Sequence, residues 1–151
     1  TFWDTLSIST KPIIASHSNA YAICPHPRNL KDDQIKALTE TGGLMCVHTF
    51  PKHVDPDKPN LSRMVDHIDY VCENFGEDYV GVGLNLTVEA DGAVKMFNEG
   101  LVDYTTLYLE GLATLDQMPA LVEELEGRGY SEETLAKILG GNFLRVLRAV
   151  L

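Results

Sequence analysis

The chain has 151 residues and is 44% hydrophobic, which is enough for a folded domain with a core and argues against a disordered chain. Its 22 acidic residues outnumber its 12 basic residues and give a net charge of −10. That balance argues against a protein that binds nucleic acid through phosphate contacts. We therefore expect a single domain over residues 1–151, with no second domain and no nucleic-acid partner.

The first strand is predicted over residues 12–15, and the first helix over the stretch NLKDDQIKALTETGG at 29–43. Asn29 is the predicted cap of this helix, the acidic pair DD favours its positive terminus, and Gly42 ends it. The buried stripe of the helix is expected to contain Leu30, either Gln34 or Ile35, and Leu38.

The second strand is predicted over LMCVHTF at 44–50, and the helix that follows it ends at Gly76. Apolar residues recur along that helix at gaps of 4, 3, 4 and 3, the spacing of an amphipathic helix. They are Leu61, Val65, Ile68, Cys72 and Phe75. The third strand is YVGVGL at 79–84, and its glycines suggest close approach by another backbone or by a ligand.

A long loop is expected over residues 85–105, before a helix in QMPALVEELEGRG at 117–129. Ser131 is the predicted cap of the next helix, which the GGN stretch at 140–142 breaks. A last helix is expected over residues 143–150. The helix at 117–129 is expected to turn one side inward, with Met118, Leu121, Val122 and Leu125.

Strands that alternate with helices predict an α/β fold with a parallel sheet. The strands are apolar along most of their length, as expected when both faces of a sheet are covered. Three strands are few, because a closed eight-stranded barrel takes about 250 residues. The chain is therefore either a small open α/β sheet or part of a TIM barrel, whose outer strands would then have edges that something else must cover.

The three cysteines are Cys24, Cys46 and Cys72, an odd number without a CxxC pair. This pattern favours free buried thiols and a reducing compartment such as the cytoplasm. No apolar run approaches the roughly 18 residues of a membrane span, and no signal-peptide pattern opens the sequence.

Polar side chains follow each predicted strand, at the carboxyl ends where parallel α/β folds bind their ligands. The sequence therefore predicts one site formed by all three strands. Its candidate residues are His17 and Arg28 after the first strand, His48 and Thr49 at the end of the second, and Asn85 and Thr87 after the third.

Each candidate also has a structural interpretation. His17 is either a metal ligand or general base, or an imidazole satisfied by a backbone carbonyl. Arg28 is either a clamp for a substrate carboxylate or a surface cation beside a helix start. His48 is either a ligand or a satisfied core histidine. His26, between two prolines, is either rigidly presented or simply an exposed loop histidine.

Other polar residues favour structural roles. His67 lies within a helix, on a different face from Asp69, and is interpreted as packing or as support for a site rather than as a primary ligand. The acidic stretch at 89–91 is interpreted as a solvated loop. No P-loop, GxGxxG, GxSxG or HExxH motif occurs, so nucleotide-binding, serine-hydrolase and zincin functions lack support.

The stretches PIIASHSNAYAICPHPRNLKDDQIKAL, VDHIDYV, YVGVG and RGYSEETLAKILGGNFLRVL together resemble the C-terminal half of the membrane (renal-type) dipeptidases. The resemblance covers nearly the whole chain, in the right order. It implies an amidohydrolase-like TIM (β/α)8 barrel, of which this chain would supply about three βα units and the terminal helices. It also implies hydrolysis of dipeptides at a site with two zinc ions.

The resemblance assigns roles to three residues. His17 matches the second metal-binding histidine of the family, and Arg28 matches an arginine that holds the substrate near its carboxylate. Asn85 stands where the family has the first aspartate of a Gly-x-Asp-Phe-Asp-Gly motif, which helps to orient the water or amine. This is a departure, because an amide cannot accept a proton as a carboxylate does.

The family's remaining metal ligands are a His-x-Asp pair, a bridging glutamate and another histidine, all of which precede the matching segment. One protein ligand cannot hold zinc, since catalytic sites use about three. The resemblance therefore implies a partner, either an N-terminal barrel half or a complementary chain, without which this segment is expected to be inactive. A homo-oligomer is also possible.

Three hypotheses follow for the function. The first is the C-terminal part of a dinuclear zinc dipeptidase, in which Arg28 positions the carboxylate of the dipeptide. The second is a non-catalytic binding or structural subunit, which Asn85 supports. The third is an independent small α/β domain with an unrelated ligand, which the exposed strand edges disfavour.

Overall fold

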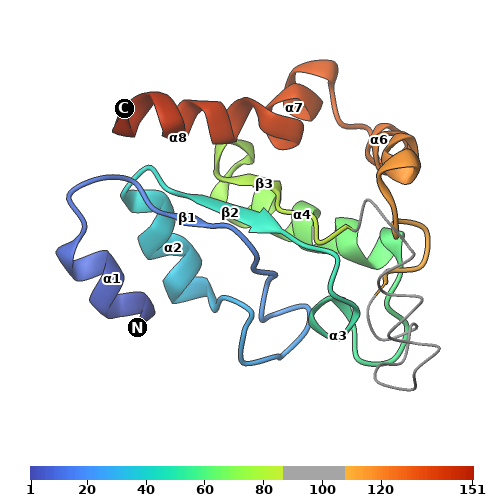
Figure 1. Cartoon of the computed structure of the whole chain (residues 1–151), viewed down its shortest axis with the longest axis horizontal. Helices are drawn as coiled ribbons and strands as arrows, with labels where there is room; N and C mark the ends of the chain where they lie inside the picture. Colours follow the sequence, from blue (N-terminus) through green and yellow to red (C-terminus); the bar gives the residue numbers. More distant parts are fainter. Residues whose placement is uncertain (87–107) are drawn as a thin grey trace.

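The computed structural model describes residues 1–86 and 108–151 (Figure 1). Its three strands are β1 (Ile14–Ala15), β2 (Leu44–Val47) and β3 (Val80–Val82). They form one parallel sheet in the order β1-β2-β3. The predicted α/β class with a parallel sheet is confirmed.

Helices follow and cover these strands. In chain order they are α1 (Phe2–Ile8), α2 (Asp32–Glu40), α3 (Pro51–Val54), α4 (Leu61–Phe75), α6 (Met118–Gly127), α7 (Glu132–Ala136) and α8 (Asn142–Val150). Short 3₁₀ turns occupy Glu77–Tyr79 and Leu115–Gln117, and a π-type turn occupies Lys137–Gly141. Within the described ranges, no helix is both long enough and apolar enough to cross a bilayer.

The sheet is covered on both faces, which explains its apolar strands. Met45, Val47 and Val80 belong to the main core, which they share with α2 and α4. Leu44 and Cys46 point to the other face and pack against Val146 of α8. Figure 1 shows α8 above the sheet and α2 below it. The ends of the sheet are thus the places where polar loops can gather.

The start of α2 differs from the prediction. Asn29 is not its cap, because the helix begins later, after Lys31, whose N–H donates to Gln34 Oε1 at 3.0 Å. Asn29 is instead buried in the loop before the helix. Ile35, rather than Gln34, completes the buried stripe with Leu38. A capping preference was therefore overridden by a buried role for the amide.

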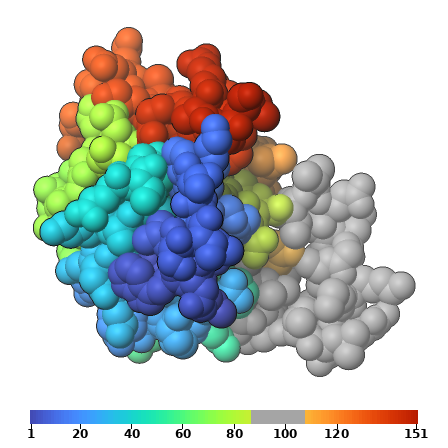
Figure 2. All heavy atoms as spheres, turned by 90° about the vertical axis from the view of Figure 1, so that its left-hand side faces the viewer, coloured from blue at the N-terminus to red at the C-terminus, as the bar shows by residue number. Residues whose placement is uncertain are grey.

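The second strand is shorter than predicted, since β2 ends at Val47. The N–H of His48 donates to Asn19 Oδ1 at 2.9 Å, so this residue has a side-chain partner on a loop. Two helices were missed. α3 has four residues and α1 has seven, too few for a periodic pattern to be recognised, although Phe2 of α1 packs against the core. α1 lies on the surface beside α2 (Figure 2).

Predicted helix ends are confirmed at several glycines and one serine. Gly42 and Gly76 have φ of 72° and 105°, a region that glycine adopts without strain. Ser131 Oγ accepts from the N–H of Thr134 at 3.2 Å, as a helix cap does. The backbone at Gly140 is non-helical and separates α7 from α8, which begins one residue earlier than predicted.

The terminal helix is anchored to the amino ends of the strands. Asn142 Nδ2 donates to the carbonyl oxygens of Glu77 at 2.7 Å and Val80 at 2.8 Å. Arg145 donates to the carbonyl oxygens of Gly42 and Asp78, both at 2.8 Å. These bonds close the amino end of the sheet, so the carboxyl end is the one left for a site.

Close backbone approach explains one glycine of β3. A Cβ built on Gly83 would lie 1.8 Å from the carbonyl oxygen of Ser16, a distance that no side chain can tolerate. At Gly81 the nearest atoms would be 3.6 Å away, which is ordinary contact. The chain segments that follow β1 and β3 therefore converge at the carboxyl end of the sheet, and Gly83 permits it.

Candidate functional site

A cavity of about 320 Å³ lies at the carboxyl ends of the strands. It brings together four residues that the sequence predicted for one site, namely His17, Arg28, His48 and Asn85. His17 and Arg28 follow β1, His48 follows β2 and Asn85 follows β3, as expected for a site in a parallel α/β fold. The other lining residues are Phe50 and His53.

His17 is exposed at the wall of the cavity. Its Nδ1 lies 3.0 Å from Ser16 Oγ, which fixes the ring through a neighbouring side chain. The centroid of its ring lies 5.9 Å from that of His48, with the ring planes 71° apart. An exposed imidazole at a cavity wall is accessible to a ligand, whereas a backbone-satisfied core histidine would not be.

His48 and His53 form a hydrogen-bonded pair of imidazoles, with His48 Nε2 3.0 Å from His53 Nδ1. Burial, reinforced by neighbouring positive groups, lowers the pKa of His48 from 6.5 to about 3 and that of His53 to about 4. Both rings are therefore neutral near pH 7, and one donates its N–H to the other. The strand-end histidine that the sequence left ambiguous is thus largely buried and paired.

Two buried asparagines hold the main chain around this pair. Asn19 accepts from the N–H of His48 and donates from Nδ2 to the carbonyl oxygen of His53 at 3.1 Å. Asn29 donates from Nδ2 to the carbonyl oxygens of Cys24 at 2.9 Å and His53 at 2.8 Å. Sequence reasoning missed both roles. The available signal was their place beside apolar residues, since a buried amide must find hydrogen-bond partners.

His67 supports the same loop from below. Its side chain is fully buried, accepts from the N–H of Ala20 at Nδ1 (3.0 Å) and donates from Nε2 to the carbonyl oxygen of Val54 (2.9 Å). Burial lowers the pKa of His67 to about 4, so the ring is neutral. The prediction of a packing role is confirmed.

Arg28 is exposed, and among residues 1–86 and 108–151 its guanidinium has no carboxylate partner. It lines the same cavity as His48 and His53, and its positive charge contributes to the lowered pKa of both imidazoles. Its main-chain N–H donates to Nδ1 of His26 at 3.2 Å. An unpaired cation at a cavity wall is suited to an anionic ligand.

Asn85 is exposed and lines the same cavity, and its N–H donates to Thr49 Oγ1 at 3.1 Å. Thr87 and the acidic stretch at 89–91 lie outside the described residues, as does most of the predicted loop at 85–105. Within the part of the chain that the structure covers, no three His, Cys, Asp or Glu side chains are grouped so as to hold a metal ion. Within the described residues, His17 therefore has no complete set of partner ligands around it.

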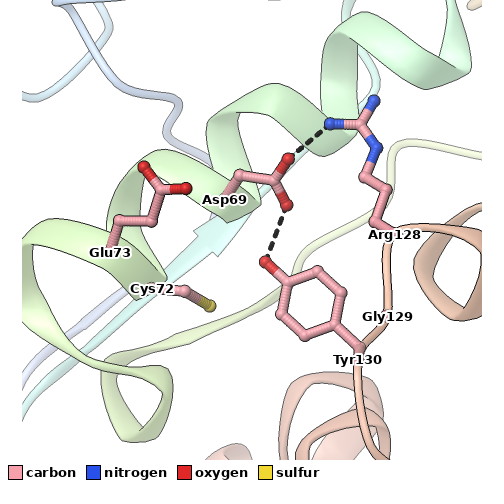
Figure 3. A pocket seen from close by; sticks show the side chains of 6 residues that line it. All are labelled: Asp69, Cys72, Glu73, Arg128, Gly129 and Tyr130. Atoms are coloured by element: carbon pink, nitrogen blue, oxygen red, sulfur yellow. Dashed lines mark hydrogen bonds and ion pairs between the residues drawn. The ribbon is translucent and has the colours of Figure 1, made fainter.

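A second polar cluster lies away from this cavity, between α4 and the turn after α6 (Figure 3). Arg128 donates to Asp66 at 2.8 Å and to Glu124 at 2.9 Å, and it also pairs with Asp69. Tyr130 donates its hydroxyl to Asp69 at 2.7 Å. These side chains flank a cavity of about 620 Å³. The carboxylates raise the pKa of Arg128, so each charge has a partner within the cluster.

Comparisons with known proteins identify the family of this chain. The model of the membrane dipeptidase family, peptidase family M19, matches residues 1–151. A protein of Klebsiella pneumoniae, "Uncharacterized protein in pqqA 5′ region", is 37% identical over 99% of this chain and 51% of its own length. Dipeptidase aclJ of Aspergillus oryzae is 33% identical over 93% of this chain and 30% of its own length.

A solved structure has the same fold. It is the metallopeptidase of Rhodobacter sphaeroides liganded with a phosphinate mimic of the dipeptide L-Ala-D-Ala, with a TM-score of 0.80 and 25% identity. The match covers 99% of this chain and 39% of the other. The chain thus spans about half the length, or less, of the relatives it matches. Because the family model covers the whole of residues 1–151, the chain belongs to the membrane dipeptidase family, peptidase family M19.

Proposed function

We propose that this chain is part of a metal-dependent dipeptidase, with zinc as the metal and dipeptides as substrates. The observation that carries the proposal is the convergence of His17 and Arg28 after β1, His48 after β2 and Asn85 after β3 on one cavity at the carboxyl ends of the strands. Relatives named dipeptidases and the metallopeptidase liganded with a dipeptide mimic support it.

The sheet supports the proposal that the chain completes a TIM barrel with other strands. In the described residues, β1 and β3 each pair with β2 alone, so each leaves one edge unpaired. Parallel strands with free edges need cover. An N-terminal barrel half, on the same or a complementary chain, would provide it and would also supply the remaining metal ligands.

His17 fits a role as one metal ligand, because an imidazole at an open cavity wall is a common zinc donor. Its Nδ1 is directed to Ser16, so Nε2 is the nitrogen that we assign to the metal. When bound, zinc supplies Lewis acidity and lowers the pKa of water. The hydrogen bond to Ser16 fixes the orientation of the ring, as partners of ligating histidines commonly do.

Arg28 would bind the carboxylate of the dipeptide through the two parallel bonds that guanidinium groups form with carboxylates. The neutral imidazoles of His48 and His53 leave its charge uncompensated within the described part of the cavity. Asn85 would contribute hydrogen bonds that orient the substrate or water but would not accept a proton at neutral pH.

The proposal is tested by dipeptide hydrolysis in the complete protein that contains residues 1–151. We expect His17→Ala to lower kcat/KM by about 10³-fold or more and to reduce bound zinc. Arg28→Ala should lower kcat/KM by about 10²-fold, chiefly through KM, without loss of zinc. Arg148→Ala, which changes an exposed arginine of α8, is the matched control and should leave both unchanged. A zinc-loaded, folded protein without turnover would contradict the proposal.

A non-catalytic binding subunit is the second candidate, supported by the amide at position 85 and by the absence of any carboxylate among the described lining residues of the cavity. Asn85→Asp separates the two candidates. In a dipeptidase the added carboxylate should change kcat, with an increase of about tenfold expected. A protein that neither binds zinc nor gains turnover from Asn85→Asp would favour the non-catalytic function.

The cysteines bear on the compartment. All three are free thiols, and burial raises the pKa of Cys46 to about 11. Free, unreactive thiols support the proposal that the protein works in a reducing compartment such as the cytoplasm.

A further inference from the structure

The turn that carries Arg28 is fixed by the side chain of His26. The carbonyl oxygen of His26 accepts from the N–H of Asn29 at 2.9 Å, so residues 26–29 form a turn with Pro27 at its second position. Pro27 has no N–H, and the next main-chain donor, that of Arg28, is directed to Nδ1 of His26 at 3.2 Å. The imidazole thus occupies the place that an Asx side chain takes in an Asx-turn.

The ring of His26 is itself held by the cavity wall. Its centroid lies 4.1 Å from that of His53, with the planes 36° apart. His53 is in turn fixed by the hydrogen bond to His48 and by ring contact with Phe50, whose centroid lies 4.7 Å away. Asn29 ties the far end of the turn to the carbonyl oxygen of His53. Both ends of the turn are therefore fastened to one residue of α3.

The fixed turn lowers the entropy that Arg28 loses when it binds a ligand. The side chain of Arg28 is exposed on a loop, and holding a flexible arginine in one geometry costs conformational entropy when it binds. A main chain that is already fixed removes part of that cost, because only the side-chain torsions remain to be ordered.

We propose that His26 is a positioning residue for Arg28: its Nδ1 accepts from the Arg28 N–H and thereby holds the turn so that the guanidinium meets the carboxylate of the substrate. The inference rests on the proposed function and deepens it. It adds that recognition of the free carboxylate depends on a residue that does not touch the substrate.

The test compares two substrates of the complete protein, a dipeptide with a free C-terminal carboxylate and the same dipeptide as its C-terminal amide. The quantity measured is the ratio of their kcat/KM values. That ratio reports on carboxylate recognition and does not change with the fraction of protein that is folded or loaded with zinc. A purely structural role for His26 would lower both values together and leave the ratio unchanged.

We expect His26→Ala to lower the ratio by about tenfold, through KM of the carboxylate substrate. His26→Asn should restore it to within about threefold of the unchanged protein, since an asparagine Oδ1 accepts from the N–H two residues on. His26→Phe keeps a ring for the stack but no acceptor, and it should behave like His26→Ala. An unchanged ratio in His26→Ala, or equal loss in His26→Ala and His26→Asn, would overturn the inference.

Arg28→Ala distinguishes this failure from failure of the proposed function. If Arg28→Ala abolishes the preference for the carboxylate, the proposed role of Arg28 stands and the His26 variants alone decide the inference. If the unchanged protein has no such preference, or if Arg28→Ala keeps it, the proposed role of Arg28 is wrong and the inference is overturned with it.

Discussion

Two arginines of this chain lie at the edges of cavities, and their surroundings are opposite. Arg128 pairs with Asp66, Asp69 and Glu124, so its charge is matched within the cluster between α4 and α6. Figure 3 shows its contact with Asp69. Arg28 faces neutral imidazoles and has no carboxylate partner in the described residues. A guanidinium whose partners are internal stabilises the fold, whereas one without partners is available to a ligand.

Volume does not single out the cavity that we propose as the site. The cavity beside Arg128, at about 620 Å³, is larger than the one beside Arg28, at about 320 Å³. The smaller one lies at the carboxyl ends of the strands and contains the unpaired cation and the exposed imidazole. Unmatched charge and position in the fold, rather than volume, therefore point to the site.

The largest expected difference between the two arginines is in stability. Arg128→Ala should lower the free energy of unfolding by about 3–4 kcal/mol, because it leaves partly buried carboxylates without their partner. Arg28→Ala should change it by less than about 0.5 kcal/mol, since that side chain is exposed. Urea unfolding measures both. The comparison breaks if the two variants lose similar stability.

Arg128→Lys sharpens this result. Lysine keeps the charge but cannot make the forked contacts by which Arg128 reaches Asp66 and Glu124 simultaneously. An intermediate loss of stability is expected, and a loss as large as that of Arg128→Ala would show that geometry matters more than charge.

The buried histidines near the proposed site and the carboxylates around Arg128 should lose their contributions to stability in different pH ranges. His67 has a pKa near 4 in the folded protein against an ordinary value of 6.5, so the unfolded chain binds more protons between these values. Stability is thus lost as pH falls from about 6.5 to about 4, by up to about 3 kcal/mol for this residue. His48 and His53 act in the same direction.

The carboxylates around Arg128 respond at lower pH. Hydrogen bonds and the charge of Arg128 hold the pKa of Asp66 and Glu124 below their ordinary values, so their contribution is lost only as pH falls through and below about 4. Urea unfolding at a series of pH values measures both windows. His67→Gln should reduce the slope of the free energy of unfolding against pH between pH 6.5 and 4, by the amount that corresponds to about one bound proton. An unchanged slope would contradict the lowered pKa of His67.

The smallest expected effect concerns the shape of the cavity. Gly83→Ala should lower stability by about 2 kcal/mol, because the new methyl group meets the carbonyl oxygen of Ser16 next to His17. Gly81→Ala, two residues earlier and on the same face of the strand, is the matched control and should cost less, since its contacts are ordinary. Thermal unfolding compares them, and equal losses would mean that strand propensity, not close approach, governs both sites.

Much of the fold was predictable because local sequence patterns specify its helices and strands. The helical period predicted α4, and apolar runs predicted all three strands. The glycines at 42 and 76 predicted helix C-termini, and Ser131 predicted a helix N-terminus. The helices that were missed, α1 and α3, have seven and four residues, which is too short for a helical period to be recognised. The misplaced cap at Asn29 arose because a local preference was overridden by distant partners.

The sequence by itself determined the class of fold, the family, and the residues that stand at the carboxyl ends of the strands. Only the tertiary structure decided which of these residues share a cavity and which are paired. His48 is satisfied by His53, five positions away, while Asn19 and Asn29 are satisfied by main-chain groups 5–34 positions distant. Such partners decide whether a polar group is hydrogen-bonded within the fold or available to a ligand. They lie too far along the chain for a local sequence pattern to reveal them.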